Sequence, residues 1–195
     1  MLDKLKDSVF VVFDCETTGL DYRKNQIIEL AGQKVKDGEV IEEFHILLNP
    51  SCPVEDGAYA THGLSNLFLA QEGLDPITEL PKFKDFVGDA VLVGHNILTF
   101  DLPFLNSELR RVGASTLQNL VVDTLIMARK LLPQLTNHKL TTVASHFKVD
   151  SKGAHRAMVD VAMNRIVFQK MLEQYLRVLQ EEDMMKKAQN SGKLL

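Results

Sequence analysis

The most informative stretch of the sequence is Val9-Phe10-Val11-Val12-Phe13-Asp14-Cys15-Glu16-Thr17-Thr18-Gly19-Leu20. Its first five residues are β-branched or aromatic, which predicts a strand buried on both faces. Asp14 and Glu16 follow two positions apart, so in an extended backbone their side chains point to the same face. Two carboxylates about 4 Å apart repel by roughly 4 kcal/mol at an effective dielectric constant near 20. We therefore expect a divalent metal ion beside them, and the alternative is a solvated acidic turn.

The length, composition and net charge limit the domain organisation and the ligands that are possible. The chain has 195 residues, of which 45% are hydrophobic, and this suits one compact domain with a substantial core. We expect the domain to span residues 1–187, followed by a disordered tail at 188–195. The net charge of −4 gives no overall attraction to nucleic acid, so a polyanion would be held locally.

Targeting signals are missing from the sequence. It contains neither a run of 18 apolar residues nor a secretory signal, so we expect no membrane partner and a cytoplasmic location. The only two cysteines, Cys15 and Cys52, are therefore expected to be reduced thiols.

Apolar runs and turn signals give the order of the secondary-structure elements. Three strands joined by short turns are predicted over 9–13, 26–36 and 39–48, and they form an antiparallel meander. Two shorter strands, at 90–93 and 120–122, alternate with helices. The fold class is therefore α/β, with a mixed five-stranded sheet flanked by helices.

The predicted helices cover most of the remaining chain. They are expected over 77–87, 102–112, 124–132, 140–147 and 156–187, after a less regular helical region that begins at 54. The last helix carries an apolar stripe that we expect in the core, formed by Val161, Phe168, Leu172, Tyr175 and Leu179.

Two further acidic residues stand at the edges of predicted elements. Asp101 follows the fourth predicted strand and directly precedes a helix, so its position fits a helix N-cap and a catalytic acid equally well. Asp160 lies in the first turns of the last helix, on a face that is otherwise apolar, where a carboxylate needs a partner. His155 precedes it on a loop that contains a glycine.

Together these segments resemble the DEDDh 3′→5′ exonuclease superfamily, which is ribonuclease H-like, and within it the proofreading exonucleases of the DNA polymerase III epsilon-subunit type. The matching segments are Phe13–Leu20, His95-Asn96 with Phe100-Asp101, and His155–Asp160, supported by 62–64 and 122–130. The likeness covers about residues 8–175. Arg156 stands where the Tyr subclass has tyrosine, which favours the His subclass.

One feature departs from the pattern of that superfamily. Three residues separate Asn96 from Phe100, whereas many epsilon-type members have two. We expect this difference to change a small loop and to leave Asp101 in its role.

The resemblance implies a role for each residue. The residues implied in catalysis are Asp14, Glu16, Asp101, Asp160 and His155. The four acids would hold two Mg²⁺ or Mn²⁺ ions per active site, and all-oxygen ligation suits these hard cations. His155 would take a proton from the attacking water, since a histidine side chain is largely neutral above pH 7.

Other polar residues receive weaker interpretations. Substrate contacts are implied at Thr17, Thr18, Leu20, His62 and Asn96. Asp123 directly precedes a helix, so we interpret it as an N-cap residue and not as a fifth catalytic acid. Glu29 stays unassigned in mid-strand, and Lys139 is interpreted as a solvated surface charge.

The implied reaction is hydrolysis of phosphodiester bonds at the 3′ end of single-stranded or frayed DNA, with release of nucleoside 5′-monophosphates in proofreading or repair. A DNA polymerase subunit is the implied protein partner. Two alternatives stay open: an exoribonuclease that trims RNA 3′ ends, and a binding module that has lost activity.

Overall fold

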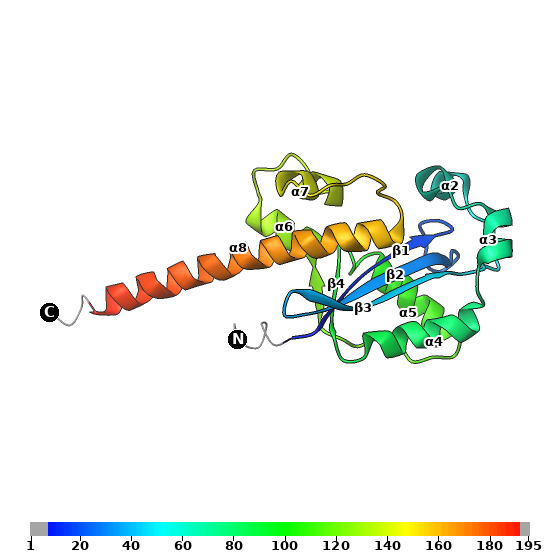
Figure 1. Cartoon of the computed structure of the whole chain (residues 1–195), viewed down its shortest axis with the longest axis horizontal. Helices are drawn as coiled ribbons and strands as arrows, with labels where there is room; N and C mark the ends of the chain where they lie inside the picture. The colour runs from blue at the N-terminus through cyan, green and yellow to red at the C-terminus, as the bar shows by residue number, and fades with distance from the viewer. Residues whose placement is uncertain (1–7, 192–195) are drawn as a thin grey trace.

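The computed structural model describes residues 8–191 of the chain (Figure 1). The tail expected at 188–195 falls partly outside these residues, because only its first four positions are described. Those four continue the last helix, which ends at Ser191 and not near Lys187.

A mixed five-stranded sheet forms the centre of the molecule. Its strands are β1 (Phe10–Thr17), β2 (Ile27–Lys36), β3 (Glu39–Leu47), β4 (Val91–Gly94) and β5 (Val121–Asp123), in the spatial order β3-β2-β1-β4-β5. β2 pairs antiparallel with β1 and β3, whereas β4 pairs parallel with β1 and β5. The predicted meander followed by two strands in α/β alternation is therefore confirmed.

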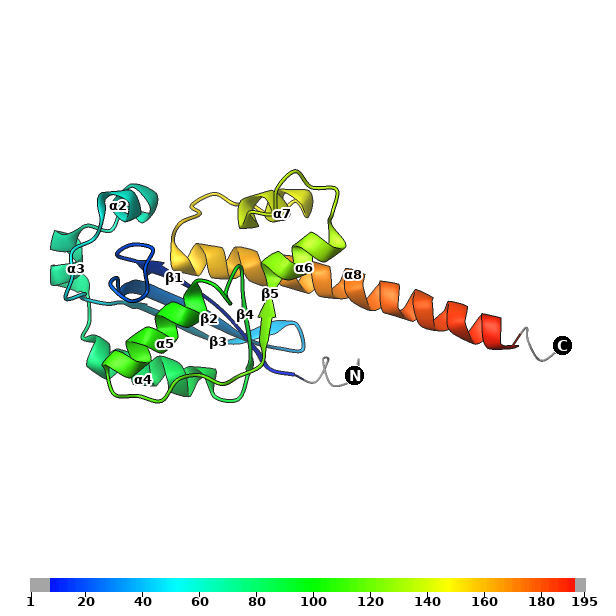
Figure 2. The ribbon, with the colours of Figure 1, turned by 180° about the vertical axis from the view of Figure 1, so that it is seen from behind.

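Helices cover both faces of this sheet. They are α2 (Asp56–His62), α3 (Asn66–Glu72), α4 (Pro76–Val87), α5 (Asp101–Arg111), α6 (Thr124–Leu131), α7 (Leu140–His146) and α8 (Ala157–Ser191). Figures 1 and 2 show α4 and α5 on one side of the sheet and α8 on the other, with α6 and α7 beside α8. None of the helices within residues 8–191 has both the length and the hydrophobicity needed to cross a membrane.

Strand β1 distributes its side chains alternately between these two layers. Val11, Phe13 and Cys15 belong to the core under α4 and α5, whereas Phe10 and Val12 pack under α8. Asp14 and Glu16 continue the second series, because residues two apart on a strand share a face. The strand is thus longer than the predicted 9–13 and directs both acids toward the side of α8.

The expected core stripe of α8 is right only for its first half. Val161 is fully buried and Phe168 nearly so, but Leu172, Tyr175 and Leu179 are only half-buried. A helix of 35 residues is about 50 Å long, and Figure 1 shows its C-terminal half extending beyond the sheet. Helical periodicity predicts a face correctly, but it does not predict how far a partner layer reaches.

Candidate active site

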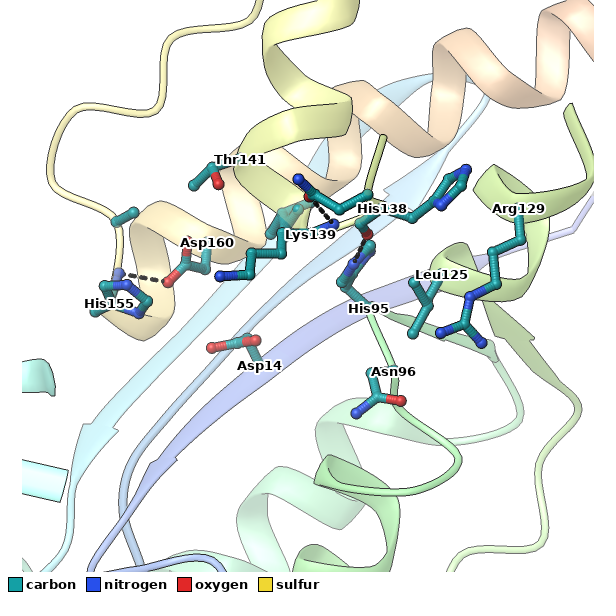
Figure 3. A pocket seen from close by; sticks show the side chains of 13 residues that line it. Asp14, His95, Asn96, Leu125, Arg129, His138, Lys139, Thr141, His155 and Asp160 are labelled. Carbon is teal, nitrogen blue, oxygen red and sulfur yellow. Dashed lines mark hydrogen bonds between the residues drawn. The ribbon is translucent and has the colours of Figure 1, made fainter. Parts of the chain in front are cut away.

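Residues from the end of β1 and the start of α8 meet in one cluster. Glu16, His155 and Asp160 each present one potential ligand atom, and these atoms all lie within 4.8 Å of one another. Asp14, His155 and Asp160 also line a cavity of about 790 Å³ (Figure 3). The structure thus brings together four of the five predicted catalytic residues, although 139 positions separate Glu16 from His155 in the sequence.

The loop before α8 fixes the relation between His155 and Asp160. The backbone N–H of His155 donates to Asp160 Oδ2 at 2.8 Å, the bond drawn in Figure 3. His155 has a φ of 69°, in the left-handed region that is unfavourable for a residue with a Cβ atom. This hydrogen bond helps to hold that conformation and leaves the imidazole exposed at the cavity.

Asp101, the fifth predicted catalytic residue, approaches β1 from α5. It is the first residue of α5, whose N-cap is Phe100, so the N-cap interpretation is wrong. Its Oδ1 accepts hydrogen bonds from the backbone N–H of Cys15 at 3.2 Å and from Cys15 Sγ at 3.3 Å. Asp101 is therefore buried and tied to the residue that separates Asp14 from Glu16.

Burial and mutual repulsion make the acids hard to ionise together. Burial first, and then the charges of Asp101, Asp160 and Glu16, raise the pKa of Asp14 well above its ordinary value. Burial, with Asp160 adding to it, raises the pKa of Glu16 to about 8. Burial also raises the pKa of Asp101 to about 6, although hydrogen bonds from Cys15 oppose it.

This cluster fits divalent cations by its chemistry. Carboxylate oxygens are the ligands that Mg²⁺ and Mn²⁺ prefer, and a nearby cation would remove the repulsion that raises these pKa values. The donor set contains one imidazole, that of His155, beside the carboxylates of Glu16 and Asp160. The residues present thus fit the metal dependence that the sequence motifs imply.

Asp123 organises the loop that leads to Asp101. It is the N-cap of α6, as predicted, and its Oδ1 accepts from the backbone N–H groups of Leu125 and Ile126. The same carboxylate accepts from the backbone N–H of Asn96 at 3.1 Å and from that of Leu98 at 3.3 Å. Asp123 thereby connects α6 to the segment before Asp101, which is a positioning role.

Glu29 is a site residue whose role the sequence left open. Its buried carboxylate, on β2, accepts from Arg156 Nε at 3.1 Å, from Arg156 Nη2 at 2.9 Å and from the backbone N–H of Ala157 at 3.3 Å. His45 Nε2 lies 2.8 Å from the same carboxylate. Burial alone would raise the pKa of Glu29, but the hydrogen bonds from His45 and Arg156 outweigh it and lower the pKa to about 2.

The Glu29–Arg156 pair ties the start of α8 to the sheet directly beside the cluster. Glu29 is paired with Glu16 across β1 and β2, and Arg156 follows His155 in the chain. An acid within an apolar strand was the only signal in the sequence, because its partner lies 127 positions away.

The predicted substrate residues occupy different surroundings. Leu20 is 84% exposed, and Asn96 lines the cavity with a φ of 66°. Thr17 and His62 are buried, and His62 Nε2 lies 3.2 Å from the carbonyl oxygen of Thr17. Thr18 has no exposed surface, so its side chain shapes the turn and cannot touch a nucleotide in this conformation.

The comparisons with known proteins agree with this geometry. The family model described as exonuclease, of the RNase T type, matches residues 11–168. The DNA polymerase III epsilon subunit of Aquifex aeolicus is 35% identical over 175 residues, which are 89% of this chain and 85% of that protein. The PolC-type DNA polymerase III of Listeria monocytogenes is 40% identical over 157 residues, which are 80% of this chain.

The chain covers very different shares of these two relatives. The chain spans only 11% of the Listeria PolC-type polymerase. Among solved structures, E. coli exonuclease I in complex with a dT13 oligonucleotide superposes with a TM-score of 0.79 at 18% identity, over 90% of this chain and 43% of that one. This last likeness concerns the fold alone.

The matched segment contains all four acids and His155, which the fold gathers at the carboxyl end of β1. The chain therefore belongs to the exonuclease family, as a 3′→5′ exonuclease of the DNA polymerase III epsilon type.

Proposed function

We propose that this exonuclease removes nucleotides one at a time from the 3′ end of single-stranded or frayed DNA and releases nucleoside 5′-monophosphates. The observation that carries the proposal is the cluster of Glu16, His155 and Asp160, whose potential ligand atoms lie within 4.8 Å of one another. The cavity beside it gives a strand access to that cluster, and Asp14 belongs to its lining.

We further propose that Asp14, Glu16, Asp101 and Asp160 hold two divalent ions, Mg²⁺ or Mn²⁺. Such ions supply positive charge that stabilises the developing negative charge on the reacting phosphate. The contribution of the chain is to hold mutually repelling carboxylates in place before the ions arrive. Asp101 is held through Cys15, and Asp160 through the backbone of His155.

His155 is the proposed general base. Its exposed imidazole lies at the cavity, while its backbone is hydrogen-bonded to Asp160. In this role the imidazole accepts a proton from the water that attacks phosphorus, and the 3′ oxygen of the preceding nucleotide leaves. The products are a nucleoside 5′-monophosphate and a strand with a new 3′ hydroxyl.

The proposed substrate contacts divide into two groups. We propose that both Leu20 and Asn96 touch the strand, because Leu20 protrudes into solvent and Asn96 lines the cavity. Thr17, Thr18 and His62 support the turn that carries Leu20, since their polar atoms bond within the protein.

The names of related proteins support the proposed substrate, protein partner, cellular role and location. The solved exonuclease I structures contain the DNA oligonucleotides dT13 and dA16, which favours DNA over RNA as the substrate. The relatives named as DNA polymerase III suggest a polymerase subunit as partner, proofreading as the role and the cytoplasm as the location.

The test compares oligonucleotides of one sequence, labelled at the 5′ end, as single-stranded DNA, mismatched duplex DNA and RNA. With Mg²⁺ or Mn²⁺ we expect a ladder of shortened DNA products, faster from mismatched than from matched ends, and none in chelator. Asp14→Asn should remove the ladder. A faster RNA ladder would replace the proposal with the exoribonuclease alternative, and the absence of any ladder would refute it.

A further inference from the structure

The cavity has a second wall that the catalytic residues leave unused. Asp14, His155 and Asp160 line one side, and the other is formed by Arg129 of α6 and the segment before α7 that contains Asn137, His138 and Lys139. We call these four residues the α6–α7 wall. Figure 3 shows the acids on its left and Arg129 and His138 on its right, with Lys139 between them.

The α6–α7 wall is held in place from several directions. His95 Nε2 donates to the carbonyl oxygen of His138 at 2.9 Å, which links the wall to the end of β4. His138 Nε2 donates to the carbonyl oxygen of Leu132 at 2.9 Å. Asn137 Oδ1 accepts from the backbone N–H of Lys139 at 3.1 Å. The backbone of Lys139 is therefore ordered although its side chain is exposed.

The side chains of the two cations of this wall are not paired with any acid or hydrogen-bond acceptor that the structure describes. Within residues 8–191, neither the ammonium group of Lys139 nor the guanidinium group of Arg129 forms a hydrogen bond or an ion pair. Figure 3 shows the Lys139 side chain extended across the cavity toward the side of Asp14 and Asp160. Lys139 is exposed, as the sequence interpretation expected, but it faces this cavity and not open surface.

A phosphate group is the ligand that fits this arrangement. The protein has a net charge of −4, so it can hold a polyanion only through local positive groups. The acidic side of the cavity is suited to the reacting phosphate together with divalent ions, which leaves the cations of the opposite side for another phosphate. Lys and Arg are the usual side chains in contacts with a nucleic-acid backbone.

We propose that Lys139 and Arg129 form a phosphate subsite, in which each of them contacts a phosphodiester of the substrate strand other than the one being hydrolysed. The proposal rests on the proposed exonuclease function and adds to it the site that holds the strand. It accounts for the binding of a polyanion by an acidic protein, and it involves no base contact and hence no sequence preference.

Two substrates separate this subsite from the reacting centre. A 5′-labelled single-stranded dT oligonucleotide has many phosphodiesters, whereas the p-nitrophenyl ester of thymidine 5′-monophosphate has only the one that is cleaved. For Lys139→Met with Arg129→Met, we expect kcat/KM to fall at least tenfold more on the oligonucleotide than on the ester. Lys130→Met is the matched control, because Lys130 Nζ lies 5.6 Å from the Tyr175 ring centroid and does not line the cavity.

Binding gives a second measurement that does not depend on turnover. In chelator, fluorescence anisotropy of the same oligonucleotide should show about fivefold weaker binding for the double variant than for wild type. The slope of log K against log salt should become shallower by about 0.7 for each phosphate contact that is lost. Lys130→Met should match wild type in both respects.

Three results would overturn the subsite. An equal loss of kcat/KM on both substrates in the double variant would place the two cations at the reacting phosphate. Unchanged kcat/KM and unchanged binding in that variant would show that the two cations contact no phosphate. A Lys130→Met variant as impaired as the double variant would reduce the effect to net charge. A wild-type protein that binds the oligonucleotide in the expected way but cleaves neither substrate would refute the exonuclease function and leave the phosphate site standing.

Discussion

Replacing Arg156 with methionine should separate the start of α8 from the sheet while keeping an unbranched apolar stem. The substitution removes both hydrogen bonds from Arg156 to Glu29, of 3.1 and 2.9 Å. Glu29, which is 1% exposed, would keep only the backbone N–H of Ala157 and the ring of His45. The substitution therefore destabilises the folded state, because the buried Glu29 carboxylate loses the positive charge and the hydrogen bonds of Arg156.

The magnitude follows from these two bonds. A hydrogen bond to a charged group contributes about 1.5–3 kcal/mol, so the pair has an upper limit of about 6 kcal/mol. The Arg156 side chain is 46% exposed, so water can replace part of it, and we expect a loss of about 2–3 kcal/mol in the free energy of unfolding. For a chain of this length, that corresponds to a Tm roughly 4–12 °C lower.

The activity of this variant should fall as well, because His155 and Asp160 flank the anchored residue. We expect kcat on a single-stranded oligonucleotide to drop about tenfold or more at a temperature well below the transition, with partial recovery in Arg156→Lys. Thermal unfolding and steady-state kinetics measure the two effects.

Arg165→Met is the matched control. Arg165 also lies on α8 and donates to a β2 side chain, Gln33 Oε1, at 2.9 Å, but Gln33 is neutral and does not line the cavity. The Arg165→Met variant should lose about 1 kcal/mol in the free energy of unfolding and keep the kcat of wild type. The positioning role of Arg156 would be refuted by a lower Tm with unchanged kcat, or by equal losses of kcat in the two variants.

Three further outcomes follow from the site. In the metal-free protein, the pKa of Glu16 is raised to about 8 and that of Asp101 to about 6, so the folded state binds more protons than the unfolded state. We therefore expect Tm to rise as pH falls from 9 to 6. A Tm that falls over this range would contradict the repulsion among the buried acids. Asp123→Ala should lose at least about 1 kcal/mol in chemical denaturation and also lower kcat, because it frees the loop before Asp101; unchanged kcat would limit Asp123 to capping. Leu20→Ala should raise KM for an oligonucleotide severalfold without changing Tm, since Leu20 is 84% exposed, and an unchanged KM would remove it from the substrate site.

The sequence predicted those parts of the structure that depend on local periodicity. Alternation along β1 correctly placed Asp14 and Glu16 on one face, and the position of Asp123 before a helix correctly gave its N-cap role. The order of strands and helices followed from turn signals, which act over a few residues.

Features that depend on distant contacts were not accessible in the same way. The sequence pattern around Asp101 suggested an N-cap, but Phe100 takes that position, and the carboxylate of Asp101 bonds instead to Cys15, 86 positions earlier. Glu29 needed Arg156 on another element before its burial had an explanation. Lys139 looks like any other surface lysine until the fold turns it toward a cavity.

A calorimetric titration of the protein with Mn²⁺ in the presence of thymidine 5′-monophosphate, repeated on Asp160→Asn, would show whether the acids hold metal ions. We expect two ions to bind per wild-type chain, with the release of protons from the acids, and at least one ion to be lost in the variant. Absence of Mn²⁺ binding by the wild-type protein, or equal binding by the variant, would contradict it.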